Sequence, residues 1–202
     1  GHHLAEGRWL KNSKSCLEDY IRFWLNRSDE GYVYSMWLVS AMLEYCELNG
    51  DYSIGTDNLD ELCRYYSYWE REHSEPCGLF WSVDNYDAME YTISGTSERL
   101  KGERGFRPTL NSYMAADAFA IAEFAEIAGK KELAAQYAEK GEHIRKLITE
   151  KLWDGDFFKS YYKTDKNGNL SFGKMPENRD ARELVGYIPW YFNLPEEGME
   201  NA

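Results

Sequence analysis

Residues Gly78–Gly95 read Gly-Leu-Phe-Trp-Ser-Val-Asp-Asn-Tyr-Asp-Ala-Met-Glu-Tyr-Thr-Ile-Ser-Gly, and after a charged stretch the chain continues as Gly105-Phe-Arg-Pro-Thr-Leu-Asn-Ser-Tyr113. The first run holds the carboxylates Asp84, Asp87 and Glu90 among the rings of Phe80, Trp81, Tyr86 and Tyr91. Neither a helical nor an alternating period orders them. Unpaired acids are costly to bury, and a solvated loop does not need so many rings. The mixture is typical of a sugar-binding cleft, where rings stack on pyranoses and carboxylates bond hydroxyls or protonate a glycosidic oxygen.

A second interpretation of this run stays open. It can be a long connection whose rings plug the end of a helical domain and whose acids are ordinary caps. The residues of the run do not decide between the two interpretations.

The composition narrows the class of protein. A length of 202 residues suits one sizeable domain, and 43% hydrophobic with 16% aromatic residues excludes disorder. The net charge of −12 argues against nucleic acid and anionic membrane as partners, because either needs a basic patch. No signal peptide or membrane-spanning run stands out. The spacing of the four cysteines suits no zinc site, so we expect no metal, no cofactor and mainly free, buried thiols.

Apolar residues at intervals of three and four predict five helices. Their expected ranges are 13–26, 34–48, 57–73, 110–128 and 131–152, with Asn49-Gly50 and Gly129 as stop signals. The segment Gly7–Leu10 looks too short for a helix. The pattern also predicts a strand over Phe157–Thr164, a hairpin turn at Asp165–Asn169 and a last short helix near Gly186–Trp190. Short turns thus alternate with long, ring-rich loops, as in helical hairpins whose long loops gather on one face.

Four stretches carry a resemblance to a known family. They are Gly1–Leu10, Trp81–Thr92, Arg107–Tyr113, and Leu152–Phe158 with its sequel Arg182–Trp190. In this order they resemble the six-hairpin glycosidases, the (α/α)6 barrels. Within them the chain is most similar to the mannosylglycerate-hydrolase-like group, which is related to glycoside hydrolase family 63 and to trehalase.

The resemblance implies an all-α fold, an αα-hairpin toroid with short β-hairpins in its loops. The sequence predicts fewer helices than a complete barrel has, since each of the six hairpins of the barrel consists of two helices. We therefore expect residues 1–202 to be a single domain that forms the N-terminal part of a larger catalytic barrel. Self-association would be a second way to complete it.

The resemblance also implies a carbohydrate substrate and an inverting hydrolysis of an α-glycosidic bond. In these families an acid in a Gly-x-Asp-aromatic-Ser motif protonates the leaving oxygen, and the matching run is Ala88-Met-Glu-Tyr-Thr92. The resemblance places the general acid at Glu90, with Asp87 as the alternative, although this run departs from the motif in having Glu for Asp and Ala for Gly. Inversion needs a second carboxylate to activate water, and no residue of this chain matches it.

Further residues are candidates for binding the sugar, and each has a structural alternative. They are Trp81, Asp84, Tyr91, Arg107, Asn111, Tyr113, Trp9, Tyr34, Trp37, Arg182 and Trp190. Arg107 and Asn111 can equally tie the loop to the helix that follows it. Trp37 and Trp190 can equally be core rings, since a ring on a helix is more often core.

The sequence leaves two main functions in competition. One is an inverting glycoside hydrolase domain; the other is a non-catalytic or degenerate carbohydrate-binding barrel, which the Glu-for-Asp change and the unmatched base favour. A helical scaffold for a protein partner is a third interpretation.

Overall fold

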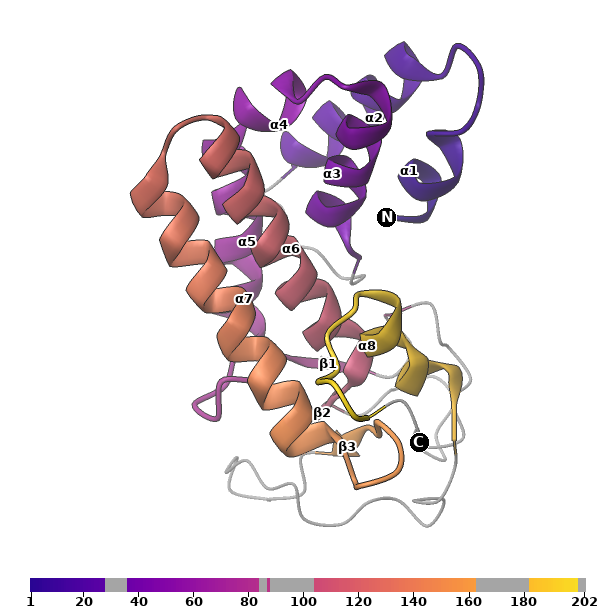
Figure 1. Ribbon diagram of the computed structural model, residues 1–202, viewed down its shortest axis with the longest axis vertical. Coiled ribbons are helices and arrows are strands. Elements are labelled where there is room, and N and C mark those ends of the chain that lie inside the picture. Colours follow the sequence, from indigo (N-terminus) through magenta and orange to yellow (C-terminus); the bar gives the residue numbers. More distant parts are fainter. Residues whose placement is uncertain (28–35, 84–86, 88–103, 163–181, 200–202) are drawn as a thin grey trace. The chain divides into compact units, whose positions relative to one another are not determined.

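The computed structural model describes residues 1–27, 36–83, 87, 104–162 and 182–199. The chain forms two compact units. Among the described residues the first unit comprises 1–27, 36–72 and 114–142, and the second comprises 73–83, 87, 104–113, 143–162 and 182–199. Figure 1 labels the elements of both.

Helices make up the first unit. Its elements are α1 (His2–Gly7), α2 (Lys14–Leu25), α3 (Leu38–Asn49), α4 (Ser53–Thr56) and most of α5 (Leu59–His73), α6 (Pro108–Ile127) and α7 (Lys131–Leu152). In α2 the buried residues Leu17, Ile21 and Leu25 recur every four positions, so one stripe faces the core. Helix α3 ends where Gly50 takes the left-handed φ of 65°, which glycine adopts without strain.

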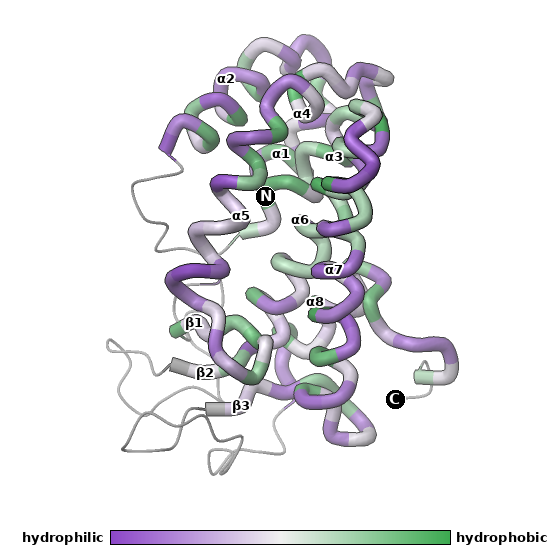
Figure 2. The backbone as a smooth tube through the Cα atoms, turned by 90° about the vertical axis from the view of Figure 1, so that its left-hand side faces the viewer, coloured by the Kyte–Doolittle hydropathy of each residue, from purple (hydrophilic) through white to green (hydrophobic). Residues whose placement is uncertain are grey.

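The helices differ in how much of their surface is apolar. Nearly every residue of α6 up to Ala125 is buried, whereas exposed polar residues recur along α7. Figure 2 shows the same contrast, with hydrophilic purple segments recurring along α7 and pale to green colour along most of α6. Helix α6 is therefore a core helix, and α7 covers it with one face.

The turn at Gly129 joins α6 and α7 into a helical hairpin. Gly129 has φ 74°, and the amide of Lys130 donates to the carbonyl of Ala125 at 2.8 Å. Helix α5 pairs with α7 through Lys140, whose Nζ lies 2.7 Å from both carboxylate oxygens of Glu70. The edge-to-face rings of Tyr66 and Tyr137, 5.2 Å apart, support the same pairing.

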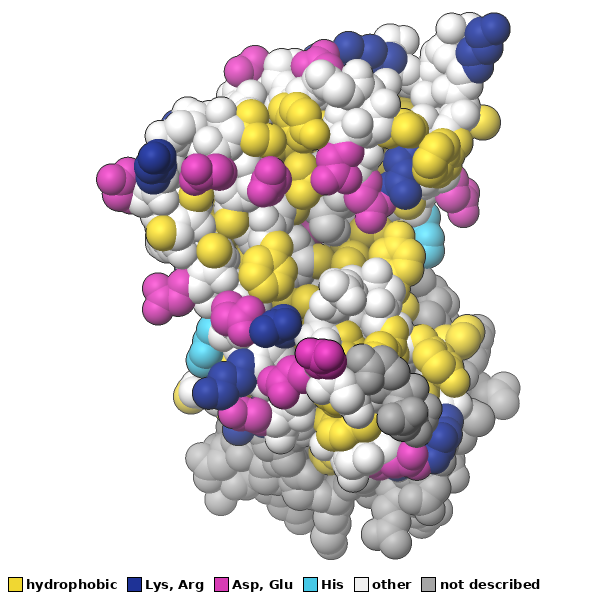
Figure 3. All heavy atoms as spheres, in the orientation of Figure 1, with side chains coloured by type: hydrophobic (Ala, Val, Ile, Leu, Met, Phe, Trp, Pro, Cys, Tyr) yellow, Lys and Arg dark blue, Asp and Glu magenta, His cyan; other side chains and the backbone are white. Residues whose placement is uncertain are grey.

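Charged groups of both signs cover the visible surface. Figure 3 shows Asp and Glu side chains interspersed with Lys and Arg over the described residues, and the basic side chains do not gather into one patch on this face. This distribution fits the net charge of −12.

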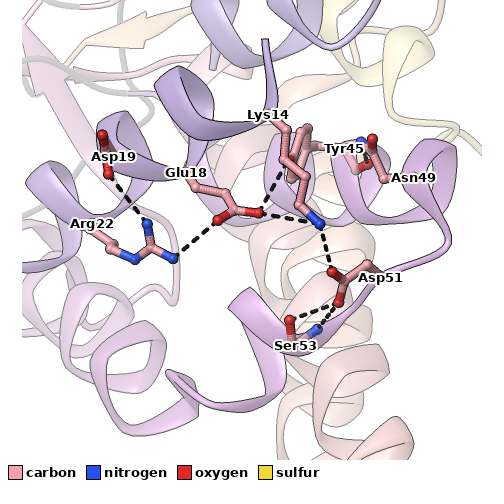
Figure 4. Close-up of polar contacts among 8 residues, drawn as sticks. All are labelled: Lys14, Glu18, Asp19, Arg22, Tyr45, Asn49, Asp51 and Ser53. Atoms are coloured by element: carbon pink, nitrogen blue, oxygen red, sulfur yellow. Dashed lines mark hydrogen bonds and ion pairs between the residues drawn. The ribbon is translucent and has the colours of Figure 1, made fainter. Parts of the chain in front are cut away.

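A surface network joins α2 to the segment between α3 and α4 (Figure 4). Lys14 Nζ lies 2.9 Å from Asp51 Oδ2, and Asp51 Oδ1 accepts bonds from the amide and hydroxyl of Ser53 at 3.1 and 2.7 Å. The hydrogen bond from Lys14, with those from Ser53, lowers the pKa of Asp51. Arg22 extends the network by pairing with Glu18 at 3.1 Å. Because these groups are exposed, the network contributes little to the free energy of unfolding.

The second unit contains the short strands. Strands β1 (Trp81–Val83), β2 (Arg104–Phe106) and β3 (Tyr161–Tyr162) form one antiparallel sheet in that order. Trp81 pairs with Phe106 and Val83 with Arg104, so the two sides of the segment between them are held together. The 3-10 helix η1 (Leu184–Tyr187) runs directly into α8 (Ile188–Tyr191).

Several predicted boundaries differ from the structure. Helix α1 occupies His2–Gly7, where no helix was expected, because Leu4 is buried and supplies the core contact a short helix needs. Helix α3 begins at Leu38 rather than near residue 34. The strand expected over 157–164 does not begin at Phe157: Phe158 makes an isolated bridge with Trp153, strand β3 holds Tyr161–Tyr162, and residues 163 and 164 lie outside the described part of the chain.

Other predictions agree with the structure. Helix α7 has the expected bounds, and all four cysteines are free. Of these only Cys46 is buried; Cys63 and Cys77 are half-buried and Cys16 is exposed. The turn predicted at 165–169 lies outside the described residues. Among the helices described, none is both long and apolar enough to cross a membrane.

Candidate functional site

Strand β1 carries the first predicted sugar-binding ring. Trp81 is half-buried, and its ring lies 4.4 Å from the ring of His73 at 31°. His73 Nδ1 also lies 2.9 Å from the carbonyl oxygen of Trp81. One face of the Trp81 ring is therefore covered by the imidazole.

Asp87 lies at the centre of a buried polar cluster. Arg107 Nε donates to its Oδ2 at 2.6 Å, and Arg107 Nη2 to its Oδ1 at 3.3 Å. The hydroxyl of Thr109 donates to the same Oδ2. Asp87, Arg107 and Thr109 all have 0% exposure. Two oxygens of one carboxylate thus receive three donors, which is how a buried charge avoids the cost of desolvation.

Asn111 extends this cluster to the start of β1. Its Oδ1 accepts from the amide of Phe80 at 2.8 Å, and its Nδ2 donates to the carbonyls of Phe80 and Arg107 at 2.9 Å each. The side chain is fully buried. Of the two roles left open by the sequence, Arg107 and Asn111 have the contacts of the structural one, because they tie the first turn of α6 to the loop. We call Asp87, Arg107, Thr109 and Asn111 the Asp87 cluster.

Three more predicted residues lie in the second unit. Tyr113 is 2% exposed and makes an edge-to-face contact with Phe192 at 5.8 Å. Arg182 is exposed and pairs with Asp156. Trp190 is half-buried, with its ring 6.2 Å from Phe158. Tyr113 and Trp190 therefore contribute mainly packing to this unit.

The first unit holds two of the predicted rings. Trp9 is 68% exposed, with the guanidinium of Arg8 over its ring at 5.4 Å. Trp37 is buried at the start of α3 and packs edge-to-face against His2 at 4.5 Å. Trp37 thus has the environment of a core ring, and Trp9 that of a surface ring.

Four predicted site residues, Glu90, Asp84, Tyr91 and Tyr34, lie outside the described residues. Their assignments remain predictions.

A buried acid that the sequence analysis did not single out lies on α6. Asp117 is fully buried, and its Oδ1 accepts the amide proton of Ser40 at 2.8 Å, so it caps the first turn of α3. Burial raises the pKa of Asp117 to about 7, and backbone hydrogen bonds from Ser40 and Val39 oppose that rise. An acid within the apolar run Met114–Ala122 was the signal for it. Thr109 was also missed, because a threonine near a helix start reads as a cap.

Within the described ranges, no group of three or more His, Cys, Asp and Glu side chains is arranged to hold a metal ion.

Comparison with known proteins gives a matching family and solved structures that are similar to this chain. The model of the mannosylglycerate hydrolase MGH1-like glycoside hydrolase domain matches residues 1–202. A solved structure of a protein named "Sialidase" is similar over 100% of this chain, with 32% identity and a TM-score of 0.81, and the match spans 18% of that chain. None of the curated proteins matches. The resemblance and the helical fold class predicted from the sequence are thereby confirmed: the chain belongs to the MGH1-like glycoside hydrolase domain family.

Proposed function

We propose that this glycoside hydrolase domain contributes the general acid to the inverting hydrolysis of an α-glycosidic bond, and that Glu90 is that acid. The observation that carries the choice is the environment of Asp87, the competing carboxylate. Asp87 is fully buried, and both its oxygens are engaged by Arg107 and Thr109. A general acid must reach the glycosidic oxygen within hydrogen-bond distance, directly or through one water, and Asp87 has no free oxygen with which to do so. Of the two carboxylates that the resemblance names for this role, Glu90 is then the better candidate.

The surroundings in the sequence suit this role. A general acid must hold its proton near neutral pH, and apolar neighbours favour the protonated carboxyl. Met89 and Tyr91 flank Glu90 in the chain. Trp81 is half-buried, and an indole ring is the kind of surface on which a sugar stacks.

The experiment uses the complete natural polypeptide that contains residues 1–202. It compares the unsubstituted protein, Glu90→Gln and the control Glu139→Gln, an exposed substitution on α7. The substrates are α-linked disaccharides of glucose and of mannose, whose sugar leaving groups need protonation. Sialyl-lactose belongs in the panel because the similar solved structure bears the name of a sialidase.

Proton NMR of the first-formed product reports the stereochemical outcome. We expect inversion, a loss of kcat of about 10²-fold or more in Glu90→Gln with binding retained, and full activity in Glu139→Gln. Binding of sugar without turnover in the unsubstituted protein would favour the non-catalytic carbohydrate-binding alternative. Unchanged turnover in Glu90→Gln would remove Glu90 from the acid role.

A further inference from the structure

Helix α3 begins without a cap from its own N-cap residue. That residue is Trp37, whose indole carries a donor and no acceptor. The first backbone N–H groups of a helix have no acceptor within the helix, so they need one from elsewhere. Asp117 on α6 supplies it: Oδ1 accepts from the amide of Ser40 at 2.8 Å, and the amide of Val39 also bonds to this carboxylate. The start of α3 is therefore held by one side chain that lies 77 residues along the chain from Ser40.

The same side chain lies in an environment that disfavours its charge. Asp117 has 0% exposure, and its Oδ2 has no hydrogen-bond partner among the described residues. On α6 it is flanked by the buried residues Ala116 and Ala118. A carboxyl that is fully buried among apolar groups favours the neutral, protonated form, whereas hydrogen bonds from amides favour the charged one. The cap of α3 therefore depends on a group whose preferred state changes with pH.

Two titratable groups of the described chain act on Asp117. Tyr66, on α5, is itself buried, and burial raises its pKa well above the ordinary value, so it stays neutral when Asp117 titrates. The amino group of Gly1, before α1, favours the ionised form of Asp117, but burial lowers the pKa of this amine to about 6. The side chain of Ser40 also favours the ionised form. Burial outweighs these effects and raises the pKa of Asp117 to about 7.

We propose that Asp117 is a pH-sensitive latch on α3, which holds residues 37–40 against α6 when it is protonated and releases them to water when it is ionised. The opening is local, confined to the first turn of α3. In the open state Asp117 is solvated and has an ordinary pKa near 4, whereas in the closed state its pKa is about 7. The closed state thus binds more protons between these values. As pH rises from about 4 to about 7, the ratio of open to closed states increases, by at most about 10³-fold, and then levels off.

Hydrogen–deuterium exchange of the complete natural polypeptide between pH 4 and pH 8 tests the latch. Mass spectrometry of overlapping peptides follows the amides of Val39 and Ser40, with labelling times corrected for the intrinsic pH dependence of exchange. These amides have no acceptor within α3, so their protection reports the bond to Asp117 directly. We expect their protection to fall by about 10- to 10³-fold between pH 4 and pH 7 and to stay constant above that range.

Two variants assign the effect to one side chain. Asp117→Asn keeps an acceptor for the Ser40 amide and has no charge to bury, so protection at Val39 and Ser40 should vary by less than about twofold over the same range. Tyr66→Phe is the matched control, because it removes a buried hydroxyl from the same unit and leaves the cap of α3 in place. It should keep the pH dependence of the unsubstituted protein. An equal fall of protection in Asp117→Asn, or loss of the fall in Tyr66→Phe, overturns the proposal.

The unsubstituted protein provides a further test that does not require either variant to fold. A local opening exposes little surface, so exchange at Val39 and Ser40 should be insensitive to low concentrations of urea. The buried Tyr137 on α7 is the reference, because its amide lies within a long helix of the same unit. Exchange at Val39 and Ser40 that accelerates with urea in parallel with that of Tyr137 would mean unfolding of the whole unit and would overturn the latch. Protection that does not change with pH would overturn it as well.

Discussion

Asp87 and Arg107, 20 residues apart in the chain, form an ion pair in which both side chains have 0% exposure and Nε lies 2.6 Å from Oδ2. The sequence names the Asp87 carboxylate as an alternative general acid, and in the structure this carboxylate is bound to Arg107. The choice of Glu90 rather than Asp87 as the acid depends on this pair.

Removing one partner of the pair should destabilise the protein strongly. Arg107→Leu leaves the Asp87 carboxylate buried without its cation, so we expect a loss of about 3–5 kcal/mol in the free energy of unfolding, measured by urea denaturation. The double variant Asp87→Leu/Arg107→Met should regain most of it, because no uncompensated charge remains. Arg71→Leu, which breaks an exposed pair with Glu72, serves as the control, with an expected loss below about 1 kcal/mol. A loss that small in Arg107→Leu would show that the pair is not buried.

Asn111→Ala should also destabilise the second unit. The change removes three hydrogen bonds and leaves the buried amide of Phe80 without its acceptor, for an expected loss of about 2–3 kcal/mol. Asn49→Ala, which removes a single bond from an exposed residue to the carbonyl of Tyr45, should cost about 1 kcal/mol or less. Chemical denaturation of the two variants provides the comparison. Equal losses would mean that the Asn111 bonds are not made in solution.

Asp117 should make stability depend on pH. Its pKa is about 7 in the folded chain against an ordinary value of 3.8, because burial disfavours the charge. Between about pH 4 and pH 7 the folded state therefore binds more protons than the unfolded state, and the free energy of unfolding falls as pH rises. Asp117→Asn keeps an acceptor for the Ser40 amide and has no charge to bury. It should be more stable than the unsubstituted protein at pH 8, by at most about 4 kcal/mol, and nearly equal to it at pH 4.

Thermal melts across this pH range, with the exposed control Asp57→Asn, measure the difference. The control should follow the unsubstituted protein at every pH. Parallel curves for Asp117→Asn and the unsubstituted protein would contradict the assignment of a raised pKa to Asp117.

Gly55 should not tolerate a methyl group. A Cβ at this position would lie 2.1 Å from Cε1 of Phe124, whose ring is fully buried in the first unit. We expect Gly55→Ala to cost about 1–3 kcal/mol through overpacking. Adding Phe124→Leu should make the glycine substitution less costly than it is in the unsubstituted protein, and a double-mutant cycle of unfolding free energies detects this coupling. Purely additive effects would mean that Gly55 and Phe124 are not in contact.

The sequence predicts the long helices well because they follow from periodic burial. Helix α7 has its predicted bounds, and Gly50 and Gly129 end their helices with positive φ. The prediction is wrong where tertiary contacts decide. Burial of Leu4 stabilises a short helix at the start of the chain, and the apolar Ile127 is 44% exposed because it lies at the end of α6.

The site is less predictable than the fold, because a charged residue can either bind substrate or form a structural ion pair, and the residue type does not tell which. Asp87 and Arg107 fit a sugar-binding loop by composition, and only their distance of 2.6 Å shows that they bind each other. Asp117 lies in the apolar part of α6, and the helix that it caps is distant in sequence, since its contact with Ser40 spans 77 residues. No periodic pattern encodes a contact of that range.

The most direct test of the central claim is the leaving-group dependence of Glu90→Gln in the complete natural polypeptide. The fluoride ion of an α-glycosyl fluoride can leave without being protonated, whereas the leaving sugar of an α-linked disaccharide needs a proton on its glycosidic oxygen. If Glu90 is the general acid, the variant hydrolyses the fluoride at a rate within about tenfold of the unsubstituted protein and loses about 10²-fold or more on the disaccharide. Equal losses on both substrates, or no loss on either, would contradict the account.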